Sequence, residues 1–134
     1  MQAFENTSLW QGSLGDAAFT RDVEARDRLR ERLLDMRSRA SHLVSLITRD
    51  MPGLTVHAVS HLDALWETAS LIAGPLYPLN PAEAFVFGAA ILLHDSAMSL
   101  AAYPGGLSEV KTTPEWRDAV AYHLRAAGTE ISPA

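Results

Sequence analysis

The chain has 134 residues, of which 48% are hydrophobic, and it carries 11 Lys and Arg against 16 Asp and Glu. This length is enough to bury a hydrophobic core without disulfide or metal cross-links. The net charge of −5 argues against an overall positive potential that would bind a nucleic-acid backbone. There is no cysteine, which excludes disulfide frameworks, thiolate zinc sites and cysteine nucleophiles and fits a reducing compartment.

The N-terminal segment does not show the pattern of a signal peptide. Residues 1–6 lack the basic start and apolar middle of a signal peptide, and no apolar stretch approaches the roughly 20 residues that span a bilayer. We therefore expect a cytoplasmic protein with no membrane partner. Residues 1–20 contain Trp10 and two phenylalanines without a regular period, and we interpret them as an arm that packs its aromatic side chains elsewhere.

A long helix is predicted from Asp22 onward. Its apolar residues recur at steps of three and four and form one stripe: Leu29, Leu33, Met36, Ala40, Leu43 and Ile47. Pro52-Gly53 ends this helix, because proline disfavours helical geometry in the residue before it.

A second helix is predicted to begin near Thr55, a suitable N-cap, and to run to Gly74-Pro75. Val59, Leu62, Trp66 and Ala69 form its buried stripe. His57 and His61 lie four residues apart on a neighbouring stripe, so the two imidazoles should point the same way.

The strongest local signal is the N-terminus of a third helix. Asn80 is a good cap, Pro81 occupies the first helical position, and Glu83 can reach back to the cap. The following run, Ala84–Leu93, is apolar all round and predicts the central, most deeply buried helix of a helical domain. His94 and Asp95 follow this run directly.

A last helix is predicted after Thr113-Pro114, reaching about Ala127 before Gly128. The expected fold is therefore all-α, with at least four helices and no sheet. The apolar stripes of the first helix (29–47) and the last (120–124) need covering, so we expect the chain to associate with itself or with further sequence.

The histidines and Asp95 predict a metal site. A metal ion of borderline hardness takes imidazole and carboxylate ligands together, and the short connection between the second and third helices favours side-by-side packing that would bring His57, His61, His94 and Asp95 together. The alternative is structural, since a histidine at a helix end is often a cap or a satisfied core group. His42 and His123 lie on charged or mixed faces and are interpreted as solvated.

The spacing of His57-x-x-x-His61 and a capped apolar helix ending in Leu92-Leu93-His94-Asp95 resembles the HD superfamily of metal-dependent phosphohydrolases. The likeness covers about residues 54–106, which look closest to HD domains that precede an Hsp-ninety-type (GHKL) ATPase in bacterial conflict proteins.

The resemblance implies a role for each of these residues. His61, His94 and Asp95 match the metal ligands, with Asp95 also part of the catalytic centre, and His57 matches the histidine that serves as general acid in cyclic-nucleotide phosphodiesterases of the superfamily. The implied cofactor is a divalent metal (Mn, Fe, Ni, Zn or Mg), and the implied substrate is a phosphoester such as a nucleotide. A downstream ATPase domain of the same protein is the implied partner, and a homo-oligomer is the other association expected.

The closing aspartate of the family has no clear match. Asp118 is the only aspartate after Asp95 and comes sooner than the family places that ligand. Two interpretations stay open: residues 21–134 form the N-terminal portion of an HD-like enzyme, or they form an HD-like module without catalysis that senses a ligand or binds a protein in bacterial defence or signalling.

Overall fold

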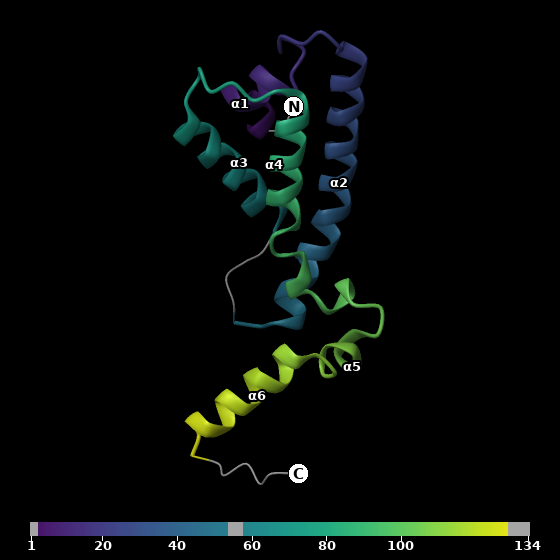
Figure 1. The fold of residues 1–134 in the computed structure, drawn as a ribbon, viewed down its shortest axis with the longest axis vertical. Helices are drawn as coiled ribbons and strands as arrows, with labels where there is room; N and C mark the ends of the chain where they lie inside the picture. The colour runs from purple at the N-terminus through teal and green to yellow at the C-terminus, as the bar shows by residue number, and fades with distance from the viewer. Residues whose placement is uncertain (1–2, 54–57, 129–134) are drawn as a thin grey trace. The chain divides into compact units, whose positions relative to one another are not determined.

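The computed structural model describes residues 3–53 and 58–128, and within these ranges it contains helices and no strand (Figure 1). The predicted all-α fold is confirmed. No helix of the described ranges is long and apolar enough to cross a membrane. The elements in chain order are η1 (Ala3–Asn6), α1 (Ser8–Ser13), α2 (Val23–Asp50), α3 (Val59–Ala73), α4 (Pro81–Leu93), η2 (Ser96–Met98), η3 (Leu100–Ala102), α5 (Gly106–Val110) and α6 (Pro114–Ala126), where η marks a 3-10 helix.

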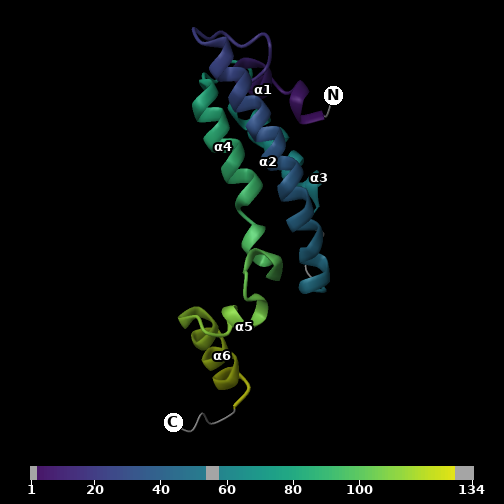
Figure 2. The same ribbon diagram turned by 90° about the vertical axis from the view of Figure 1, so that its right-hand side faces the viewer.

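The chain forms two compact units, residues 1–99 and residues 100–134. In the first unit, α4 packs against both α2 and α3, and Figure 2 shows α2 and α4 lying side by side. The N-terminal elements η1 and α1 pack on α3 in the same unit. The predicted boundary between an N-terminal arm (1–20) and an HD-like domain (21–134) stays a prediction.

Side-chain caps set the starts of α2 and α4. The Asp22 side chain accepts a hydrogen bond from the Ala25 backbone N–H at 2.8 Å, which places the start of α2 at Val23. Asn80 accepts from the backbone N–H groups of Ala82 and Glu83, and the Glu83 carboxylate accepts from the Asn80 N–H at 2.9 Å. This reciprocal arrangement is the predicted capping box of α4.

The start of α3 differs from the prediction. The helix begins at Val59, after Ala58 with an extended backbone (φ −137°, ψ 166°) and no side-chain cap, whereas the sequence placed the start near Thr55. Thr55 itself lies outside the described residues. A side-chain cap is one of several ways to satisfy the first N–H groups of a helix, so a suitable cap residue does not fix the start.

The prediction that the whole run Ala84–Leu93 is the most deeply buried is wrong. One face of α4 is buried, through Ala84, Gly88 and Leu92, while Val86 is 66% exposed and Leu93 is 48% exposed. The reason is that α2 and α3 cover α4 within the first unit from one side.

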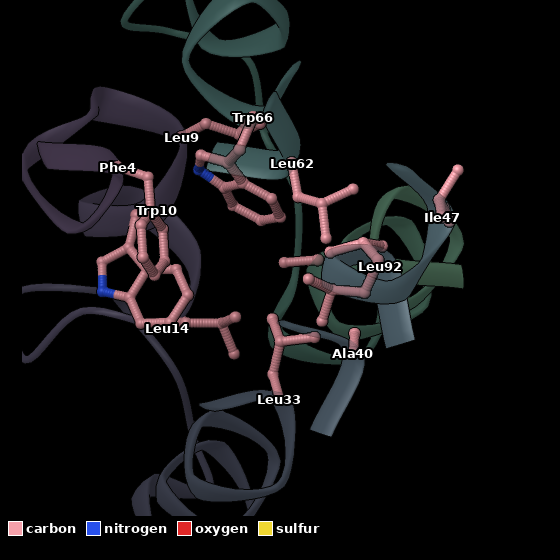
Figure 3. Packing of buried hydrophobic residues seen from close by; sticks show 12 residues of the cluster. Phe4, Leu9, Trp10, Leu14, Leu33, Ala40, Ile47, Leu62, Trp66 and Leu92 are labelled. Carbon is pink, nitrogen blue, oxygen red and sulfur yellow. The ribbon is translucent and has the colours of Figure 1, made fainter. Parts of the chain in front are cut away.

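The core of the first unit is aromatic at its N-terminal side. The ring of Trp10 makes edge contacts with Phe4 and Trp66, at centroid distances of 5.1 and 5.8 Å, and Figure 3 shows these rings grouped beside Leu14. The Trp66 indole N–H donates to the hydroxyl of Thr7 at 3.0 Å, which satisfies the one polar atom of the ring. The predicted arm therefore packs Phe4 and Trp10 into this core, whereas its third aromatic side chain, Phe19, is 94% exposed, against the prediction.

The aliphatic side of the core lies between α2 and α4. Leu33, Ala40, Val44 and Ile47 of α2 are buried, and so is Leu92 of α4. The predicted apolar stripe of residues 29–47 is therefore buried at Leu33, Ala40 and Ile47 and half-buried at Leu29, Met36 and Leu43, and the association expected from it stays a prediction.

The second unit is small and exposes most of its apolar side chains. The Thr113 hydroxyl caps α6 by accepting from the Trp116 N–H at 3.2 Å, as the sequence predicted. Val120 and Leu124 remain exposed, and no described residue of α6 is buried. The predicted need to cover this stripe stands.

Candidate metal centre

Three predicted site residues meet where α3 begins and α4 ends. His61 occupies the first turn of α3, His94 is the C-cap of α4, and Asp95 follows it as the N-cap of η2. One possible ligand atom from each of these side chains lies within 4.8 Å of the other two. The predicted convergence is therefore observed for these three residues, while His57 lies outside the described part of the chain.

The separations suit coordination of one ion. His94 Nε2 lies 2.8 Å from Asp95 Oδ2, and His61 Nε2 lies 3.7 Å from the same oxygen. Two ligands of one ion, each about 2.0–2.2 Å from it, lie about 3–3.5 Å apart in tetrahedral or octahedral geometry. The three side chains could thus close on a metal ion with small shifts.

A backbone carbonyl fixes which nitrogen of His94 faces the cluster. His94 Nδ1 lies 2.7 Å from the Ile91 carbonyl oxygen, and because a carbonyl oxygen only accepts, Nδ1 carries the hydrogen and donates. Nε2 is then the nitrogen that faces Asp95. Metal-binding histidines show this arrangement: the second ring nitrogen donates to a carbonyl and so fixes the ring and its tautomer.

The short contact between Nε2 and Oδ2 places two possible ligand atoms of adjacent residues side by side, 2.8 Å apart. The donor set, two imidazoles and one carboxylate, fits the borderline divalent metals and does not select one of them.

The cluster is accessible from solvent. The side chains of His61 and His94 are 41% and 39% exposed, whereas Asp95 is 18% exposed. A small molecule can therefore reach this point, and the carboxylate sits deepest.

The other histidines and the candidate closing aspartate lie elsewhere on the chain. His42 is exposed on α2, as expected for a solvated residue, and His123 is exposed on α6. Asp118 is exposed on α6 in the second unit.

Two contacts near the site were not predicted. The Ile91 carbonyl has no signature in the side-chain sequence, because every residue carries one. Asp50 accepts a hydrogen bond from Ser99, beyond η2, and its sequence signal is an acid placed as the last residue of a long helix, where it is disfavoured.

A histidine in one helix that meets a His-Asp pair at the end of the next, within an all-α fold, defines an HD-type domain. The model of the HD-CE family matches residues 51–132, so the chain belongs to the HD-CE family. No curated protein and no solved structure matches the chain.

Proposed function

We propose that this HD-type domain binds a divalent metal through His61, His94 and Asp95 and hydrolyses a phosphoester, with a nucleotide or cyclic nucleotide as the substrate class. The observation that carries the proposal is the triangle of ligand atoms within 4.8 Å, together with the Ile91 carbonyl that turns His94 Nε2 toward it. Membership of the HD-CE family supports the same chemistry.

The chain's own residues would hold the ion and transfer a proton to the leaving oxygen. A divalent ion, when bound, lowers the pKa of a bound water and neutralises a phosphoryl oxygen. Asp95, the least exposed of the three, provides the charged ligand, and the two imidazoles complete one face of the site. His57, by resemblance, donates its proton to the leaving oxygen as the phosphorus–oxygen bond breaks and the bond to the water oxygen forms. A phosphodiester gives a phosphate monoester and an alcohol, a cyclic nucleotide gives one ring-opened monoester, and the proton that the water loses passes to solvent.

The partners belong to the same proposal. An Hsp-ninety-type ATPase domain following this domain in the same protein would place the site in a bacterial conflict system, in the cytoplasm. Mn, Fe, Ni, Zn and Mg all remain candidates for the metal.

One observation favours a second candidate, an HD-like module that binds a ligand or a protein without turnover. An apolar groove of about 450 Å³ lies beside α3 and α4 in the first unit and is lined by Leu9, Ala69, Ile72, Ala73, Tyr77, Leu79 and Phe87. Exposed apolar surface of this kind is typical of binding sites.

Phosphodiesterase assays decide between the two candidates. The 134-residue chain is incubated with bis-para-nitrophenyl phosphate and with cyclic nucleotides, in the presence of each candidate metal. The enzyme proposal expects turnover by the native chain and by His42→Ala, the matched control, and at least about 100-fold less by His94→Ala, the loss expected when a metal site is broken. Absence of turnover in a metal-loaded chain would refute hydrolysis by these 134 residues and favour the binding module.

A further inference from the structure

Asp50 is a buried carboxylate at the C-terminal end of α2, and its placement is unfavourable by itself. Its side chain is 7% exposed, and it is the last residue of a 28-residue helix. The C-terminal end of a helix carries partial negative charge, so an acid there is repelled, and burial adds a desolvation cost. Contacts that offset these costs are therefore expected around it.

Two side chains supply such contacts. Arg49 donates to Asp50 Oδ1 through Nε at 2.9 Å, and its Nη2 lies 2.8 Å from the same oxygen. The hydroxyl of Ser99, which is fully buried, donates to Asp50 Oδ2 at 3.1 Å. One oxygen is thus held by a neighbour in the helix, and the other binds a residue 49 positions further along the chain.

Ser99 closes the turn that begins with the metal-site carboxylate. Asp95 is the N-cap of η2 and Ser99 is its C-cap, and the Met98 N–H donates to the Asp95 carbonyl at 2.9 Å. Met98 also packs against the core. A hydrogen bond that fixes Ser99 therefore fixes the far end of the turn that carries Asp95.

We propose that Asp50 is a positioning residue for the metal centre: through Ser99 it holds η2 against α2 and so sets the place of Asp95 relative to His61 and His94. This inference rests on the proposed function, because it concerns the same metal site. Residues that orient metal ligands also affect metal affinity, and their loss weakens binding by about 10- to 100-fold.

The test is a titration of the full chain with Co²⁺, whose visible absorption reports both affinity and ligand geometry. Asp50→Ala should weaken Co²⁺ binding by about 10-fold or more and change the spectrum. Ser99→Ala should do the same to a smaller extent, and the double variant should be no weaker than Asp50→Ala, because the two residues act through one contact. Asp50→Asn, which keeps an acceptor oxygen for Ser99, should recover part of the affinity.

The matched control is Asp27→Ala. Asp27 lies near the other end of the same helix and pairs with Arg26 at 2.8 Å, so its loss removes a comparable ion pair far along α2. This variant should have a lower midpoint of thermal unfolding than the native chain. Its Co²⁺ affinity should stay within about twofold of the native value, as expected of independent sites.

Each outcome is decisive. If Asp50→Ala and Ser99→Ala fold, by circular dichroism, and bind Co²⁺ like the native chain, Asp50 is merely structural and the inference falls. If Asp50→Ala fails to fold, Ser99→Ala and Asp50→Asn decide in the same way. If the native chain itself binds no Co²⁺, the proposed function fails first and the inference with it, which distinguishes the two failures.

Discussion

Replacing Gly88 with alanine tests the packing of α4, the helix that carries His94 at its end. A Cβ at this position would lie 2.7 Å from Leu33 Cδ2 and 3.0 Å from Trp66 Cζ3. Both neighbours are 4% exposed, and the rigid indole of Trp66 can yield only by moving as a whole, whereas the end of the Leu33 side chain can rotate. The glycine therefore lets three helices approach closely.

Two opposing terms set the size of the effect. Alanine in a helix interior is favoured over glycine by about 1 kcal/mol. Overpacking a well-packed core costs about 1–3 kcal/mol. Because the added carbon meets two buried side chains, we expect the upper part of this range, and a net loss of about 1–2 kcal/mol in the free energy of unfolding.

Urea unfolding followed by circular dichroism measures this loss. The matched control is Gly12→Ala in α1, where an added Cβ would have nothing within 4 Å, so the propensity gain alone should stabilise the chain. If Gly88→Ala raised the unfolding midpoint as Gly12→Ala does, the close packing of α4 on Leu33 and Trp66 would be refuted.

Three further predictions concern stability. Leu92→Ala, at a buried position of α4, should cost about 2–5 kcal/mol in urea unfolding, and a cost below about 1 kcal/mol would contradict its place in the core. Asn80→Ala should cost about 0.5–2 kcal/mol by removing the acceptor of the capping box, and an unchanged midpoint would show that the cap is dispensable. The hydrogen bond and positive charge of Arg30 hold the pKa of Asp16 below its ordinary value of 3.8, so the pair stabilises the fold above that pH and loses this contribution as the pH falls through the lowered pKa. Between pH 2 and 6, the unfolding midpoint should therefore change less with pH in Asp16→Asn than in the native chain. Equal pH dependence of the two midpoints would contradict this.

Long periodic segments with strong caps were predictable from sequence. The apolar stripe of α2 and the caps at Asn80 and Thr113 placed three helices to within a residue or two at their starts. Local hydrogen bonds and a regular period encode these features, and neither depends on distant parts of the chain.

The N-terminal elements were not predictable, because a helix of four to six residues shows no period. Burial along α4 was overestimated for a different reason. Sequence shows that Val86 and Leu93 are apolar, but which face of a helix is covered depends on its neighbours in space.

For the metal centre, the residue types and the helix spacing were sufficient to predict that His61, His94 and Asp95 would meet. The contacts that orient them were not. The carbonyl of Ile91 and the pair of Asp50 with Ser99 depend on backbone geometry after α4 and on a contact between residues 49 positions apart. Such partners become visible only when the chain is folded.

Metal content after equilibrium dialysis tests the central claim most directly. The chain is dialysed against Mn²⁺ or Zn²⁺, and the bound metal is measured by elemental analysis for the native chain, for His61→Ala and His94→Ala, and for His123→Ala as the matched control. We predict that the native chain and His123→Ala retain metal equally, and that His61→Ala and His94→Ala each lose most of it. Equal retention by all four chains, or none by the native chain, would contradict a metal centre at His61, His94 and Asp95.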